Sequence, residues 1–304
     1  MKNYVQAFLD TYPYDEEAKR EVLTALDKIS QNAEGFAEIN AILDAYEADK
    51  DCHFGSMLKR ARAAFAKAEV GEHLGELLFC ILLSKPLLGH YRAQGIPEQI
   101  FWDTMYDHYY KAVECKLVCG HYGNFVTYWF DRYYNLTRFA LGRFQFEVNR
   151  FGHTYERDGL SLSPDSPVIG VHIPRSGASL TREALDESYA KASVFFKEQL
   201  GDAPIAFVCD SWLLFERHKE MLPKTAGICR FMADYDIIES RLYENYGEVW
   251  RLFDTFYEGD LSALPADTTL RRAYIELMRR GEQTGCGVGV FFYEQYLRDL
   301  PVKI

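Results

Sequence analysis

Three side chains with catalytic chemistry lie at the ends of two short apolar runs. His172 lies near the end of residues 168–173, Cys209 ends residues 205–209, and Ser211 follows two positions later. An imidazole can act as a general base, a hydroxyl can protonate a leaving thiolate or polarise a carbonyl, and a thiol beside an imidazole can be a nucleophile. Each residue also has a structural interpretation: a hydrogen-bonded core histidine, an inert buried cysteine and a serine that caps a helix.

Both apolar runs indicate buried strands, and the chain between them indicates a loop and a helix. The first run is short, β-branched and bounded by Pro167 and Pro174, which favours a strand over a helix. A helix is expected from near Thr181, a good N-cap residue, to Gly201. The order of strand, helix and strand predicts a βαβ unit with parallel strands, whose carboxyl ends therefore meet at one edge of the sheet.

The loop between this strand and this helix has the composition of an anion-binding site. It is the sequence Arg-Ser-Gly-Ala-Ser at residues 175–179, so its backbone N–H groups can approach a bulky anion closely. The N-terminus of the following helix adds a dipole that favours negative charge at the same place. Many α/β connections have this form without binding a ligand, so the pattern alone leaves a purely structural role open.

Composition and charge exclude several classes of protein. The chain has 304 residues, enough for two domains, and 48% of them are hydrophobic and 26% charged, as in soluble globular proteins. No segment approaches the ~20 apolar residues of a membrane span. The N-terminal region lacks the apolar core of a signal peptide, so a cytoplasmic protein is expected. A net charge of −11 argues against nucleic acid as a partner.

The cysteines favour a reduced protein without a metal. There are seven, an odd number, and none forms a Cys-x-x-Cys pair, which indicates free thiols. Cys115, Cys119 and His121 have the types of metal ligands, but a zinc site needs a second ligand pair at a workable spacing, and the sequence shows none. We therefore expect no metal site.

Hydrophobic periodicity indicates helices throughout the first part of the chain. From Asp15 to about Leu136 nearly every segment has the spacing of an amphipathic helix. A strongly apolar helix is expected to stop before Pro86, because the residue before a proline disfavours the helical conformation. Residues 125–134 are aromatic on all sides and indicate a buried helix.

After about residue 136 the spacing of apolar residues changes from that of helices to that of strands. Residues 137–147 alternate around Gly142, as in two short strands or one strand with a bulge. A further strand is expected at residues 231–240, and the Gly-x-Gly-x-Gly run at residues 285–289 indicates a closing strand rather than a dinucleotide site. We expect a helical domain at residues 1–136 and an α/β domain at residues 137–304.

Four segments of the expected α/β domain have a pattern in common with a known family. They are LGRFQFE from Leu141, VHIPRSGASL from Val171, FVCDSWLL from Phe207 and GICRFMADYDII from Gly227. Together and in this order they resemble a family of predicted bacterial acyltransferases. Members combine an N-terminal helical domain with a C-terminal domain similar to the GNAT superfamily of N-acyltransferases. The resemblance covers nearly the whole chain and implies an α+β fold in which a GNAT-like mixed sheet is flanked by helices.

The resemblance also implies a site for acyl-CoA. In that superfamily the pantetheine pairs with a splayed strand, and the pyrophosphate lies on the amides of the loop that follows. The matching residues here are Val171, His172, Ile173, Arg175, Ser176, Gly177, Ala178, Ser179 and Leu180. The superfamily loop pattern is Gln/Arg-x-x-Gly-x-Gly/Ala. In this chain Pro174 and Ser179 stand at its first and last positions, and Arg175 comes one place late.

The implied reaction moves an acyl group, with acetyl expected, from acetyl-CoA or another acyl-CoA to the amine of a small acceptor. Direct attack is expected, with His172 as base, Ser211 assisting the leaving thiolate and no metal. Two alternatives stay open. One is a non-catalytic ligand-binding or regulatory protein, which the altered loop pattern favours. The other is a hydrolase that uses a nucleophilic pair of Cys209 and His172.

Overall fold

The computed structural model describes residues 1–299 and divides the chain between Ala140 and Leu141 into two compact units. The first unit is helical and the second contains a mixed sheet with helices, so the α+β fold that the sequence predicts is confirmed. Within the described part of the chain, no helix combines the length and the apolar composition needed to cross a bilayer.

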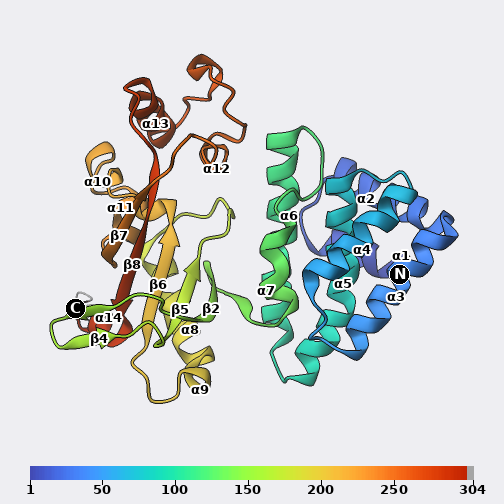
Figure 1. Ribbon diagram of the computed structural model, residues 1–304, viewed down its shortest axis with the longest axis horizontal. Coiled ribbons are helices and arrows are strands. Elements are labelled where there is room, and N and C mark those ends of the chain that lie inside the picture. The colour runs from blue at the N-terminus through green and yellow to red at the C-terminus, as the bar shows by residue number, and fades with distance from the viewer. Residues whose placement is uncertain (300–304) are drawn as a thin grey trace. The chain divides into compact units, whose positions relative to one another are not determined.

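The N-terminal unit is a bundle of helices (Figure 1). Side-chain caps begin several of them: the Asp15 carboxylate accepts a hydrogen bond from the Ala18 amide at 2.8 Å, and the Asn32 side chain accepts from Gly35 at 2.8 Å. The helical segments are α1 (Lys2–Thr11), α2 (Glu16–Gln31), α3 (Ala33–Ala48), α4 (Phe54–Lys67), α5 (Glu72–Ala93), α6 (Glu98–Cys119), the 3-10 helix η1 (Thr127–Phe130) and α7 (Asp131–Tyr134).

Two expectations for this unit need correction. Helix α5 does not stop before Pro86 but continues to Ala93. Residues 77–83 and Leu87 are buried, and this packing outweighs the roughly 3 kcal/mol that an interior proline costs a helix. The aromatic helix expected at residues 125–134 is shorter, since only η1 and α7 are helical there.

The strands form a six-stranded sheet in the order β1-β2-β5-β6-β8-β7 and a separate hairpin of β3 and β4 (Figure 1), and all of them except β1, which ends at Leu141, lie wholly in the C-terminal unit. Strands β5 and β6 are parallel, whereas β2 with β5, β6 with β8 and β7 with β8 are antiparallel. The strands are β1 (Arg138–Leu141), β2 (Phe144–Arg150), β3 (Tyr155–Arg157), β4 (Leu160–Leu162), β5 (Pro167–His172), β6 (Ala206–Ser211), β7 (Asp236–Leu242) and β8 (Gly285–Phe292).

Helices and short turns fill the chain between these strands. They are α8 (Arg182–Phe195), α9 (Lys197–Leu200), the 3-10 helix η2 (Trp212–Leu214), α10 (His218–Met221), α11 (Gly227–Met232), α12 (Trp250–Phe253), the 3-10 helix η3 (Leu261–Ala263), α13 (Thr269–Arg279) and α14 (Tyr293–Asp299). The predicted βαβ unit is confirmed as β5, α8 and β6, with Thr181 as the N-cap of α8. The expected single helix up to Gly201 is divided at Phe196 into α8 and α9.

The two faces of the sheet differ in their cover. On one side, here called the α8 face, Tyr189 of α8 packs against Phe146, Phe207 and Phe291. On the other side, here called the hairpin face, Leu162 of the hairpin joins a core cluster with Val168, Ala206, Val290 and Phe292. Because side chains alternate along a strand, neighbouring residues of β5 and β6 point to opposite faces.

The strand expected at residues 231–240 is wrong in its first half. Residues 227–232 form helix α11, and β7 begins only at Asp236. Phe231 and Met232 are buried in this helix, so an apolar pair that suits a strand is used to pack a helical turn instead. The run at residues 285–289 does form the expected closing strand, β8.

Gly285 and Gly287 of β8 are needed because backbone carbonyl groups of other segments approach them closely. A Cβ added at Gly287 would lie 2.5 Å from the carbonyl oxygen of Leu214. Replacing Gly287 by alanine is therefore expected to lower the free energy of unfolding by about 1–3 kcal/mol, the usual cost of overpacking. The measurement is urea denaturation followed by circular dichroism. Gly227→Ala is the control, since its Cβ would come no closer than 3.4 Å to Leu180. Equal stability of both variants would contradict the prediction.

Candidate acyl-CoA site

Strands β5 and β6 separate at their carboxyl ends. They pair only at Ile169 with Phe207 and at Gly170 with Val208. Beyond these pairs β5 stays with β2 as far as His172, and β6 stays with β8 as far as Ser211. The two strands thus open a gap in the sheet whose backbone groups face each other without pairing. Backbone of this kind can accept an extended ligand that has amide groups of its own.

His172 lies beside this opening with a carboxylate as its partner. Its Nε2 is 2.7 Å from Oε1 of Glu147 on β2. Glu147 is opposite Gly170 in the antiparallel register, and His172 is two residues after Gly170. The side chains of Glu147 and His172 therefore both lie on the hairpin face. The Glu147 side chain is 5% exposed and that of His172 is 21% exposed. The imidazole is therefore reachable from solvent, whereas the carboxylate that orients it is buried.

This contact determines how the imidazole carries its proton. While Glu147 is ionised it can only accept a hydrogen bond, so Nε2–H then donates to it and the lone pair of the neutral ring is on Nδ1. A histidine held in this way can take a proton at Nδ1, and the neighbouring carboxylate then stabilises the imidazolium. His172 and Glu147 together have the chemistry of a general base and the group that orients it.

The loop after β5 is open on its outer side. Gly177 has φ +73°, and nothing lies within 4 Å of the position where a Cβ would be. Gly177, Ala178 and Ser179 are exposed. On its inner side Arg143 closes the loop: Nε donates to the carbonyl of Ala178 at 3.1 Å, and a terminal nitrogen donates to that of Pro174 at 3.1 Å. The loop is therefore held from the sheet side while its outer surface is accessible.

Arg175 is not placed to bind a phosphate group, because its side chain is engaged by a carboxylate. Its guanidinium forms an ion pair with the carboxylate of Asp254, which also binds Arg271. The arginine that stands one place late in the loop pattern is thus held by a partner outside the loop. An anion on this loop would rely on backbone N–H groups and on the N-terminus of α8, where Thr181 Oγ1 accepts from the Ala184 amide at 3.3 Å.

The structure does not bring Cys209 and His172 together. Cys209 is opposite Gly289 and faces α8, whereas His172 is on the hairpin face. Burial raises the pKa of the Cys209 thiol well above its ordinary value. A neutral, buried thiol is a poor nucleophile. Ser211 also points to the α8 face, and its Oγ accepts from the Leu213 amide at 3.2 Å, so it caps η2.

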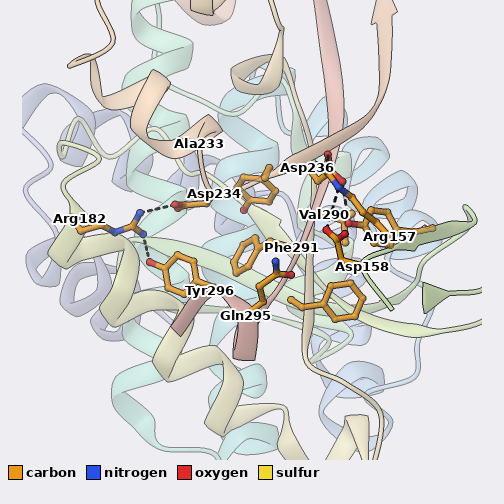
Figure 2. Close-up of a pocket in the computed structure, with 13 residues that line it drawn as sticks. Arg157, Asp158, Arg182, Ala233, Asp234, Asp236, Val290, Phe291, Gln295 and Tyr296 are labelled. Carbon is orange, nitrogen blue, oxygen red and sulfur yellow. Dashed lines mark hydrogen bonds and ion pairs between the residues drawn. The ribbon is translucent and has the colours of Figure 1, made fainter. Parts of the chain in front are cut away.

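Apart from the opening between β5 and β6, a cavity of about 460 Å³ lies between β7, β8, α14 and the β3–β4 hairpin (Figure 2). Arg182 at the start of α8 points to Asp234 and Tyr296, with 2.6 Å between its guanidinium and the Asp234 carboxylate. Burial raises the pKa of Asp234, and Arg182 opposes this effect. Arg157 binds Asp236 at 2.7 Å. Asp234 and Asp236 thus each have an arginine as ion-pair partner, so the cavity does not favour the binding of a cationic amine substrate.

Sequence reasoning missed Glu147. Its signal was weak but present, because Gln145 and Glu147 alternate with Phe144 and Phe146, and both polar side chains are buried in the structure. Buried polar groups of this kind need partners. The partner of Glu147 is His172, 25 residues away, and only the register between β2 and β5 brings the two together.

Comparison with known proteins agrees with this architecture. The chain matches the family models of an N-acyltransferase N-terminal domain over residues 3–136 and of a GNAT-like C-terminal domain over residues 138–291. A search of curated proteins gives no sequence match.

Solved structures of acyltransferases share the fold. One, in complex with decanoyl-CoA and teicoplanin, has a TM-score of 0.75 at 18% identity, covering 95% of this chain and 87% of the other. Another, in complex with CoA and 10C-teicoplanin, has a TM-score of 0.69 at 18% identity, covering 92% and 89%. Two family models in the expected order, together with this fold, confirm the resemblance. The chain belongs to the acyltransferase family that joins an N-acyltransferase N-terminal domain to a GNAT-like C-terminal domain.

Proposed function

We propose that this chain transfers an acyl group from acyl-CoA to an amine, with the pantetheine arm between β5 and β6. The observation that carries the proposal is the register of these strands, which pair at Gly170 and Val208 and part beyond them. The pantetheine arm contains amide groups that can pair with such unpaired strand backbone. The loop at residues 174–180 follows directly, so the pyrophosphate would lie on its amides and at the N-terminus of α8.

His172 would act as the base in this reaction. An amine is protonated near neutral pH and must lose a proton before or during attack on the thioester. His172 is beside the strand opening, partly exposed, and oriented by Glu147 at 2.7 Å. A net charge of −11 also favours the approach of a cationic amine over that of an anionic acceptor.

Direct attack on the thioester is the proposed route. The amine nitrogen bonds to the acyl carbon, its proton passes to Nδ1 of His172, and the C–S bond breaks to release the CoA thiolate, which is then protonated. A covalent route would need a nucleophile, and Cys209 is buried on the opposite face of the sheet with a raised pKa. Ser211 is the proposed donor to the thiolate: it ends β6 at the opening on the α8 face, opposite His172, and its Oγ, which accepts from the Leu213 amide, still has its own hydrogen to donate.

The acyl group is proposed to be longer than acetyl. Similar acyltransferase structures contain decanoyl-CoA and octanoyl-CoA, which favours a medium-length chain over the acetyl group that the sequence resemblance implies. One such structure also contains teicoplanin. Teicoplanin and simple primary amines are therefore the first acceptors to test with this chain.

Calorimetric titration tests the proposed donor site. Octanoyl-CoA is expected to bind the full-length protein with a Kd in the micromolar range, and acetyl-CoA more weakly. Gly177→Trp is expected to abolish binding by covering the loop. Ala178→Glu places a negative charge beside the pyrophosphate and is expected to weaken binding by at least about tenfold.

Ala190→Glu is the matched control for the second variant. Ala190 is also exposed and lies on α8, but three turns from the loop, so this variant should bind octanoyl-CoA like the wild-type protein. Absence of binding up to millimolar octanoyl-CoA and acetyl-CoA would overturn the proposal. Equal weakening by Ala178→Glu and Ala190→Glu would move the pyrophosphate away from this loop.

A further inference from the structure

Three potential metal ligands meet in the N-terminal unit, at the start of α5 and the end of α6, and a second histidine lies beside one of them. His73 is the second residue of α5, and Cys115 and Cys119 lie on the last turns of α6. The two cysteines are four residues apart and therefore share one face of the helix. His121 follows in the loop after α6. The donor set consists of two thiols and two imidazoles, which is a common set for structural zinc.

Three of these groups, His73, Cys115 and Cys119, lie close enough to share one ion, and His121 lies beside His73 with its ring stacked on that of His73. The ligand atoms of His73, Cys115 and Cys119 lie within 4.8 Å of one another. His73 Nδ1 is 3.8 Å from Cys115 Sγ and 3.0 Å from His121 Nε2. Zinc bonds of about 2.0–2.1 Å to nitrogen and 2.3 Å to sulfur imply edges of about 3.6 Å between N and S and about 3.3 Å between two nitrogens.

The turn after α6 is built around His73. Gly120 ends α6 with φ +81°, a left-handed conformation that glycine adopts without strain. The chain then reverses, and the Asn124 amide donates to the carbonyl of His73 at 2.9 Å. A Cβ at Gly123 would lie 2.5 Å from the Cβ of His73. These contacts hold His121 beside His73, so the loop cannot easily move the fourth ligand away.

The surroundings allow an ion to enter and remain. Cys115 is buried, His73 and Cys119 are partly buried, and His121 is exposed. The site is thus reachable from solvent on the side of His121. The ring of Phe125 lies 6.2 Å from that of His73, which supplies an apolar neighbour. Low local polarity strengthens the bond between a thiolate and a cation.

We propose that His73 Nδ1 and the thiolates of Cys115 and Cys119 bind one Zn²⁺ ion that fastens the end of α6 to the start of α5, and that the His121 ring turns from its place beside His73 to supply Nε2 as the fourth ligand. Binding replaces the hydrogen bond between the two imidazoles. Both thiols must lose their protons to solvent when the metal binds. The role is structural, because the four protein ligands leave no open position for a substrate.

Metal analysis of the full-length protein tests this proposal. The protein, purified with a non-thiol reductant and without chelator, is expected to hold one equivalent of zinc by inductively coupled plasma mass spectrometry. After zinc removal, a titration with Co²⁺ should give the thiolate charge-transfer bands and the visible bands of a tetrahedral site. Cys119→Ser should lose the zinc and these bands. Cys52→Ser, which changes a partly buried cysteine elsewhere in the same unit, should keep both.

A second variant makes the test independent of folding. His121 is exposed in the loop, so His121→Ala should fold normally by circular dichroism and yet bind Co²⁺ more weakly, with altered visible bands. Wild-type protein that shows no thiolate bands with Co²⁺ would overturn the proposal. So would equal zinc content in Cys119→Ser and Cys52→Ser, because the ion would then lie elsewhere. In either case the cluster is only a hydrogen-bonded pair of histidines beside two thiols.

Discussion

Replacing His172 by glutamine is expected to lower kcat/KM for acyl transfer by about 10²–10⁴-fold, the usual contribution of a general base. Glutamine can still donate a hydrogen bond to Glu147, which holds His172 at 2.7 Å, so the local contact is retained. It has no basic nitrogen, however, and cannot accept the proton of the attacking amine. The measurement is the initial rate of CoA release from octanoyl-CoA with teicoplanin or a primary amine as acceptor.

Two further variants separate this role from others. Glu147→Gln should cause a smaller loss of kcat/KM, because the imidazolium that forms during attack loses its neighbouring carboxylate. Cys209→Ala should keep most of the activity, since direct attack does not use the buried thiol. Octanoyl-CoA should bind His172→Gln with an unchanged Kd by calorimetry. Full activity of His172→Gln would rule out His172 as the base, and an inactive Cys209→Ala that still folds would favour a covalent route.

The local part of the candidate site could be predicted from sequence because its signals are close together in the chain. Prolines on both sides of a β-branched run, a loop of small residues and Thr181 as N-cap lie within fifteen residues of one another. These features depend on backbone preferences that operate over one turn or one strand. The parallel pairing of β5 and β6 follows from the handedness and length of the crossover between them.

The partners of the site residues could not be predicted because they depend on registers between distant segments. Glu147 reaches His172 only through the pairing of Gln145 with His172 in β2 and β5. The ligand that completes the proposed zinc site is His73, and it lies 42 residues before Cys115. Spacing along the chain cannot show such a pair, since it results from the packing of α5 on α6.

Tertiary packing also explains the elements that the sequence misassigned. Pro86 is a helix breaker by its local chemistry, yet α5 continues through it because the surrounding side chains are buried. Residues 231–232 have the composition of a strand but complete helix α11. In both places the free energy of burial exceeds a local preference of a few kcal/mol at most.

Replacing Tyr189 by alanine is expected to lower the free energy of unfolding by about 3–5 kcal/mol, as for other large buried aromatic residues. Tyr189 is fully buried on α8, and its ring contacts those of Phe144, Phe207 and Phe291 at centroid distances of 5.7, 5.1 and 4.9 Å. The truncation would leave a cavity between α8 and the sheet. The measurement is urea denaturation followed by circular dichroism of the full-length protein.

Two controls separate packing from the hydroxyl group and from a general effect of losing a tyrosine. Tyr189→Phe removes only the hydroxyl, 3.3 Å from that of Tyr235, and should cost about 0.5–1.5 kcal/mol. Tyr128→Ala changes a side chain that is 67% exposed and should stay within about 0.5 kcal/mol of wild type. Because α8 follows the loop at residues 174–180, Tyr189→Ala should also weaken octanoyl-CoA binding under conditions in which it is still folded. A loss of stability no larger than that of Tyr189→Phe would show that other contacts hold α8 on the sheet.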